Sequence, residues 1–267
     1  MYGFHDMQTV SNNVPTSSHQ LIYNGVNFDE VFTTDSTSFV TLSVTGRGLA
    51  QRKHTVVEQD GIDGGMTESI NYLPRSLTVK VKVSASTDDA FRTLIEDINL
   101  KLFTRYDVDI QFTDEVFKYQ GHFLTSTEPE ELKNEQVLEL DFYCGNPFKL
   151  NAEKSITVAS GGRIEIDSHF PVRPYIDMTF DTAQKVVTIS NTTTGQVLKI
   201  DSTVGKTKWA VQLYGEPVSN DSVINKNHLK YMPLDSDFRD FNIDTGDRVV
   251  VQPAPSLLTF KYEGVKL

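Results

Sequence analysis

The chain of 267 residues has one cysteine, one tryptophan and no long apolar run. With Cys144 alone, no intrachain disulfide can form and no cysteine metal cluster can be built. No segment approaches the roughly 20 apolar residues needed to cross a bilayer, so no membrane partner is expected. Residues 1–6 lack the basic start and apolar stretch of a signal peptide, which predicts synthesis in a cytoplasm without secretion by the usual route.

Positive charge is also scarce, since 36 acidic residues face 25 basic ones and the formal net charge is −11. Such a surface repels a phosphate backbone on average, so sequence-specific nucleic-acid binding is not expected. An acidic protein can still surround DNA that must slide past without sticking. The hydrophobic fraction of 38% suits a folded protein, and this length can bury two modest cores or one large one.

The most informative segment is Val137–Phe148, which begins as a strand and stops abruptly at Gly145-Asn146-Pro147. Proline cannot donate to a sheet ladder and restricts the residue before it. One side of the predicted strand is apolar and comprises Leu138, Leu140, Phe142 and Cys144. A strong helix pattern occurs before this segment and none after it, so we expect two domains, residues 1–145 and 146–267.

The first half predicts a β-sheet domain with one helix. Asn24-Gly25 marks a tight hairpin in Leu21–Phe28, because both residues tolerate positive φ. Ser86 is the expected N-cap of a helix over about 87–103. Further strands are expected at Phe39–Val44, Leu77–Val83, Asp107–Phe112, Val116–Leu124 and Val137–Cys144. The long polar segment at about 51–72 predicts an extended hairpin arm that leaves the body of the domain.

The second half predicts only short strands separated by turn-forming residues. The expected strands are Ile164–Ile166, Tyr175–Phe180, Lys185–Ile189, Val197–Ile200, Trp209–Leu213, Arg248–Gln252 and Leu257–Tyr262. This spacing is typical of a β-sandwich. The expected fold class is therefore mainly β: a β-sandwich-like first domain with one α-helix and the hairpin arm, then a β-sandwich second domain.

Two glycine-bearing segments could indicate ligand sites. One of them resembles a calcium-binding loop in composition: Asp60-Gly61-Ile62-Asp63-Gly64-Gly65. A calcium loop needs an oxygen ligand at its third position, which is Ile62 here, and a glutamate at its end, which is missing. A turn is therefore favoured over a metal site. Gly46-Arg47-Gly48 is too short to be a phosphate-binding loop, and a turn or strand end is the better interpretation. The second interpretation is that Arg47 lies at an interface between subunits.

No catalytic, cofactor-binding or metal-binding residue is predicted. The six histidines lack the helical spacing of a zinc site, and no Gly-x-Ser-x-Gly elbow is present. Cys144 falls on the inward side of its strand, so a buried and inert thiol is favoured over a nucleophile. The carboxylates Glu128, Glu130, Glu131 and Glu135 cluster in a predicted loop, where a solvated charge run is the ordinary explanation.

Four aromatic residues of the second half could form a platform for sugar, namely Trp209, Tyr214, Tyr231 and Phe238. Trp209 alternates with Val211 and Leu213, and this period favours core packing. A carbohydrate-binding module that contacts the host cell wall is nevertheless kept as the alternative function.

The order and spacing of several motifs resemble the distal tail protein (Dit) family of long-tailed siphophages, mainly those that infect Gram-positive bacteria. The resemblance covers most of the chain. The motifs are Tyr23-Asn24-Gly25-Val26, Val44-Thr45-Gly46-Arg47-Gly48, the arm around Asp60-Gly61, Leu73-Pro74-Arg75-Ser76-Leu77-Thr78-Val79, Leu138–Phe148 and Phe241-Asn242-Ile243-Asp244-Thr245-Gly246-Asp247.

The resemblance implies a structural virion protein at the phage tail tip and no enzyme. The first domain is expected to form a hexameric ring whose opening continues the DNA channel, with arm and sheet edges linking neighbours. The second domain, likened to galectin or a carbohydrate-binding module, is expected to project outward. Expected partners are further copies of the chain, the tail tube protein, the tail hub or tail-associated lysin protein, and a receptor-binding protein.

Overall fold

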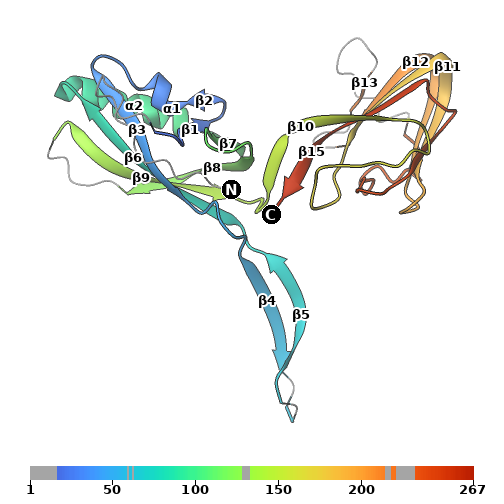
Figure 1. Cartoon of the computed structure of the whole chain (residues 1–267), viewed down its shortest axis with the longest axis horizontal. Helices are drawn as coiled ribbons and strands as arrows, with labels where there is room; N and C mark the ends of the chain where they lie inside the picture. Colours follow the sequence, from blue (N-terminus) through green and yellow to red (C-terminus); the bar gives the residue numbers. More distant parts are fainter. Residues whose placement is uncertain (1–16, 59, 62, 128–132, 214–217, 221–231) are drawn as a thin grey trace. The chain divides into compact units, whose positions relative to one another are not determined.

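The structure is a computed structural model that describes residues 17–58, 60, 61, 63–127, 133–213, 218–220 and 232–267. Strands dominate throughout, so the prediction of a mainly β chain is confirmed (Figure 1). The chain divides into two compact units, Met1–Lys149 with Leu267, and Leu150–Lys266. This division falls within a few residues of the predicted seam, while the roles predicted for the two parts remain predictions.

The first unit is a curled antiparallel sheet with a helix against it. Its strands are β1 (Leu21–Tyr23), β2 (Val26–Asn27), β3 (Thr37–Thr45), β4 (Arg52–Glu58), β5 (Gly65–Tyr72), β6 (Arg75–Ala85), β7 (Val108–Phe112), β8 (Lys118–Thr127) and β9 (Glu135–Cys144). The start of β8 pairs with β7 and the rest of β8 pairs with β9. Strand β9 pairs on its other side with β6, and β6 pairs with β3. Strand β8 therefore joins the two parts of the sheet.

Helices differ from the prediction in two respects. The predicted long helix is present as α2 (Asp88–Leu102), but its N-cap is Thr87 and not Ser86, because the Thr87 side chain accepts from the Ala90 amide. A second, four-residue helix, α1 (Phe28–Val31), follows the Asn24-Gly25 hairpin, so the prediction of a single helix is wrong. In the hairpin itself both turn residues have positive φ, as expected.

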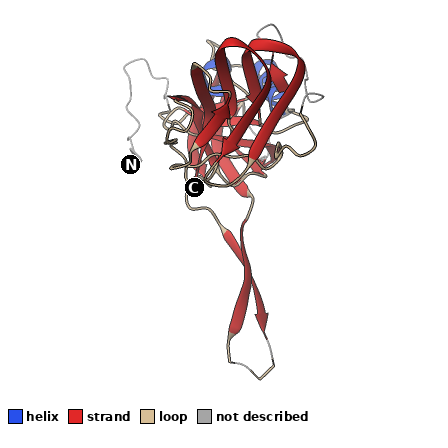
Figure 2. Ribbon diagram, turned by 90° about the vertical axis from the view of Figure 1, so that its right-hand side faces the viewer, coloured by secondary structure: helices blue, strands red, loops and turns tan. Residues whose placement is uncertain are grey.

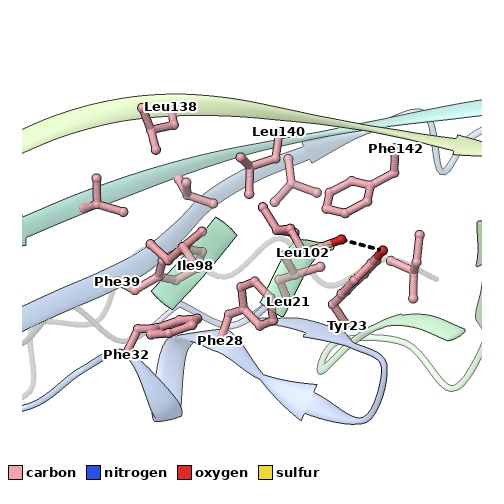
Figure 3. Close-up of a cluster of buried hydrophobic side chains, with 14 of the residues drawn as sticks. Leu21, Tyr23, Phe28, Phe32, Phe39, Ile98, Leu102, Leu138, Leu140 and Phe142 are labelled. Atoms are coloured by element: carbon pink, nitrogen blue, oxygen red, sulfur yellow. Dashed lines mark hydrogen bonds between the residues drawn. The ribbon is translucent and has the colours of Figure 1, made fainter. Parts of the chain in front are cut away.

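The core of the first unit lies between α2 and the curled sheet (Figure 3). The predicted inward side of β9 is confirmed, because Leu138, Leu140, Phe142 and Cys144 are all buried. Phe28 of α1 packs edge-to-face against Tyr23 and Phe32. The Tyr23 hydroxyl donates to the Leu102 carbonyl oxygen at 3.3 Å, so the buried ring also satisfies the last turn of α2.

One buried carboxylate holds three elements of this unit together. Asp29 of α1 accepts hydrogen bonds from the Leu21 amide of β1 (3.2 Å) and from the Thr41 amide and hydroxyl of β3 (2.8 and 2.6 Å). Since buried backbone donors need partners, Asp29 replaces ladder partners that β1 and β3 lack at this point. Helix α1 therefore serves to place the Asp29 carboxylate between β1 and β3.

The second unit is also β, with longer strands than expected. They are β10 (Lys149–Val158), β11 (Tyr175–Asn191), β12 (Val197–Gln212), β13 (Val218–Asn220), β14 (Val249–Gln252) and β15 (Leu257–Lys266). The two predicted pieces 175–180 and 185–189 merge into β11, and 197–200 and 209–213 contribute to β12. Strand β10 was not predicted, whereas Ile164–Ile166 forms no strand and only Arg163 beside it makes an isolated bridge.

Strand β11 connects two parts of the second unit's sheet. Its first residues, Tyr175–Thr179, pair with β15, and its last residues, Thr188–Asn191, pair with β14. The pairing with β12 is irregular between Thr179 and Val186, where the sheet bends. This unit has its own apolar core, which includes Trp209, Phe241 and Phe260. The β-sandwich architecture of this unit and its likeness to galectin remain predictions. No helix among the described residues is long and apolar enough to span a membrane.

Candidate assembly surfaces

The predicted arm is a separate two-stranded hairpin of β4 and β5 (Figure 2). Val57 lies directly opposite Met66 on one face, and His54 opposite Ile70 on the other. Val56, Val57, Met66 and Ile70 are about half exposed or more, with Met66 at 72%. The arm thus carries apolar side chains on both faces and buries neither face within the described chain.

Both edges of the arm are open. Strand β4 pairs with β5 and, among the described residues, with no other strand. An isolated hairpin is at best marginally stable in water, and unpaired strand edges can pair with another chain. The arm would therefore become more stable if a second protein covered it.

The root of the arm is fixed to the body of its unit. The Leu73 amide donates to the Gln51 carbonyl oxygen at 2.9 Å, which closes the two strands at their base. The Arg52 guanidinium lies 4.8 Å over the Tyr72 ring and donates to its hydroxyl at 2.9 Å. The Tyr72 ring in turn contacts Phe148 edge-to-face at 5.2 Å.

Arg75, the first residue of β6, holds three backbone segments at this root. Its Nε donates to the Pro147 carbonyl oxygen at 3.0 Å, and its Nη1 donates to those of Gly46 and Gly48 at 2.6 and 3.0 Å. Arg75 is 6% exposed. It therefore connects the segment that enters the arm, the strand that leaves it and the end of the first unit.

Gly46-Arg47-Gly48 is a strand end, as predicted. Gly46 has φ +89°, and a Cβ atom there would lie 2.0 Å from the Ser76 carbonyl oxygen, so glycine is required. The Arg47 guanidinium pairs with Asp114 at 2.7 Å and covers the Phe112 ring at 5.0 Å. Arg47 is thus engaged within its own chain, and the alternative of an arginine at a subunit interface stays a prediction.

A buried charged cluster lies next to these residues. The Glu115 carboxylate is 3.7 Å from Arg47 Nη1 and 3.8 Å from Lys149 Nζ. Burial, together with the nearby negative charge of Glu115, strongly raises the pKa of Tyr119, so this phenol stays neutral. The Tyr119 phenol is therefore not prepared to release its proton near neutral pH.

Ile62 lies outside the described residues, and the other residues of Asp60–Gly65 are exposed, with positive φ at Gly61 and Gly64. The described part of the chain holds no group of three His, Cys, Asp or Glu side chains arranged for a metal ion. Of the carboxylate run, Glu135 pairs with Lys82 at 3.0 Å, while Glu128, Glu130 and Glu131 lie outside the described residues.

Cys144 is fully buried, as predicted. Burial raises the pKa of its thiol to about 12. Only the thiolate is nucleophilic, so the folded chain presents no reactive cysteine.

We expect Cys144 to react with a thiol reagent such as dithionitrobenzoate orders of magnitude more slowly in the folded chain than in denaturant at pH 8. The pKa of the Cys144 thiol is higher in the folded chain than in the unfolded chain. The contribution of this difference to folding stability is therefore complete below the unfolded pKa and is lost as the pH rises toward 12. Absorbance kinetics with and without guanidinium measure the difference. Equal rates would show that the thiol is accessible.

The sugar platform does not form around Trp209. Its ring is 1% exposed and its Nε1 donates to the Gln184 carbonyl oxygen at 3.1 Å, so the predicted core packing is confirmed. Phe238 packs partly buried against the same core, while Tyr214 and Tyr231 lie outside the described residues. None of the exposed large apolar side chains described in the second unit is aromatic.

No protein-family model matches the chain. It is 31% identical over 127 residues to the distal tail protein of Bacillus phage SPP1, a match that covers 46% of this chain and about half (49%) of that relative. In fold it is similar to the crystal structure of the SPP1 Dit protein, with a TM-score of 0.76, 21% identity and coverage of 93% of this chain and 99% of the other.

A chain of the phage P2 baseplate in its activated conformation shares the fold more distantly, with a TM-score of 0.59, 9% identity and coverage of 92% of this chain and 97% of the other. The chain is thus similar to structural proteins of the phage tail and baseplate. More closely, the resemblance to siphophage distal tail proteins predicted from the motifs is confirmed, in sequence for part of the chain and in fold for nearly all of it.

Arg75 is the structural residue that sequence reasoning missed. It appeared only as part of the family motif before the strand. A signal was available, because Arg75 has the same parity as Leu77, Val79, Val81 and Val83 and so occupies the inward side of β6. A charged residue at an inward position indicates a buried partner.

Proposed function

We propose that the chain is a distal tail adaptor whose copies close into a hexameric ring at the tip of a siphophage tail. The observation that carries the proposal is the arm, a hairpin with two open edges and exposed apolar residues on both faces. Such a hairpin gains stability by lying on a neighbouring copy, and a head-to-tail contact of this kind can close into a ring. The six-fold number rests on the family resemblance.

The ring is proposed to join the tail tube protein on one side to the tail hub or tail-associated lysin protein on the other. Assembly is assigned to the first unit, which carries the arm, and outward attachment, including any receptor-binding protein, to the second. The net charge of −11 favours passage of DNA through the opening with little adhesion. The chain is then a virion component that catalyses no reaction.

The test of this role is co-assembly with its two neighbours in the tail. Purified chain is mixed separately with the tail tube protein and with the hub protein of the same phage, and the mixtures are analysed by size-exclusion chromatography with light scattering. The proposal expects a complex with each of them. A chain that binds neither protein would contradict the adaptor role.

A further inference from the structure

The end of α2 and the loop after it form a second exposed apolar surface of the first unit. Leu100 lies in the last turn of α2, and Phe103 is the C-cap three residues later, so the two side chains are neighbours. Tyr106 follows in the loop, and the exposed fractions of the three residues are 72%, 71% and 81%. Lys101 and Arg105 lie between them in sequence and are exposed as well. We call these five residues the helix-end patch.

The loop that carries Tyr106 is anchored on both sides of this residue. Before it, the Thr104 hydroxyl lies 2.9 Å from the hydroxyl of the buried Tyr23 in β1. After it, the Asp107 carboxylate lies 2.7 Å from Nδ1 of His122 in β8. The aromatic ring therefore stays in water on a loop that is fixed to the sheet. Exposed apolar side chains that gather in this way mark an interaction surface.

The two cations of the helix-end patch are not engaged within the described part of the chain. Other basic side chains of the first unit are, as Lys80 is with Glu139 at 3.3 Å. No ion pair joins Lys101 or Arg105 to another described residue. In a chain with a net charge of −11, unpaired positive charge beside apolar surface favours an acidic partner.

The distal part of the arm offers the complementary surface. Residues 55–72 contain no lysine or arginine. The exposed apolar pair of Val57 and Met66 lies among acidic residues of this stretch. These exposed acidic residues are Glu58, Asp60, Asp63 and Glu68. The arm thus combines apolar and negative groups, where the helix-end patch combines apolar and positive ones.

We propose that the arm of one copy of the chain lies on the helix-end patch of the next copy. The inference rests on the proposed ring and names the surface that receives the arm. Because arm and patch are different surfaces of one chain, the contact is head-to-tail, as a closed ring requires.

The place of the patch in the first unit supports this contact. The ring of His122, which anchors the patch loop, contacts the ring of Tyr143 at 5.7 Å, and Tyr143 lies opposite Ser76 at the start of β6. The patch therefore lies at the end of the unit from which the arm leaves. The arm strands of 7 and 8 residues span about 25 Å at roughly 3.3 Å per residue, so the arm extends beyond its own unit.

The test exchanges the charges of the two surfaces in the full chain. One variant carries Lys101→Glu with Arg105→Glu, and the other carries Glu58→Lys, Asp63→Lys and Glu68→Lys. In each variant alone, arm and patch have the same sign, so sedimentation velocity is expected to show self-association at least about tenfold weaker than in the unaltered chain. In an equal mixture each arm meets a patch of opposite sign, and the association is expected to return to within about threefold of the unaltered chain.

The control is Arg92→Glu with Lys133→Glu, which changes the net charge as much as the patch variant at exposed positions outside the patch. It should leave association unchanged, and equal melting temperatures show that the variants are folded. Undiminished self-association of the patch variant, or a mixture that associates no better than its components, would overturn the inference while the ring stands.

Two further results would also contradict the inference. A patch variant that keeps the ring but no longer binds the tail tube or hub protein would assign the patch to that protein. An unaltered chain that stays monomeric, alone and with the hub protein, would overturn the ring and this inference together.

Discussion

Replacing residues 51–72 by a short glycine–serine linker is expected to abolish the proposed ring and leave a folded monomer. The hydrogen bond from the Leu73 amide to the Gln51 carbonyl shows that the ends of the arm are adjacent, so a short linker can close the gap. The arm contributes no residue to the buried core of its unit. Its removal therefore takes away the proposed assembly surface and is expected to leave the body of the unit folded.

The measurement is the mass in solution together with the melting temperature of each form. A milder variant, Val57→Ser with Met66→Ser, is expected to weaken association because these two side chains form one exposed apolar pair across the strands. Leu234→Ser removes an even more exposed apolar side chain from the other unit and serves as the control. A deletion variant that still forms rings would remove the arm from the account.

Asp29→Ala is expected to destabilise the first unit by about 3 kcal/mol, since buried amides of Leu21 and Thr41 lose their acceptor. For a unit of this size the loss corresponds to a decrease of roughly 10 °C in melting temperature. Calorimetry on the full chain measures the decrease in melting temperature. The two units can unfold in one transition or in two, and the decrease is read from the transition of the first unit.

Asp35→Ala is the control for this substitution, because Asp35 is exposed and the change should cost less than about 0.5 kcal/mol. If Asp29→Ala melts at the temperature of the unaltered chain, the carboxylate does not hold β1, α1 and β3 together. In that case helix α1 would owe its position to Phe28 and Phe32 alone.

The sequence correctly predicted those elements that a short stretch of residues determines by itself. The alternation in β9 and the helical period of α2 each reflect one buried face, and Asn24-Gly25 encodes its own turn. Helix α1 could not be predicted, because four residues carry no period and the helix is held by the tertiary contacts of Asp29.

The second unit was harder to predict for a related reason. Strand β10 has exposed charged residues in its middle, and its pairing with β15 decides its conformation more than its own pattern does. The bend in β11 divides one long strand into two apparent short ones. The contacts of Arg75 were equally invisible, since Gly46, Arg75 and Pro147 meet only after folding.

The most direct test of the account is the mass of the assembled chain in solution. Native mass spectrometry of the purified protein, at several concentrations, is predicted to show a species of six copies of the 30.0 kDa chain, supported by six-fold particles in negative stain. A chain that remains monomeric at every concentration, alone and with its hub partner, would contradict the claim that it closes into a tail-tip ring.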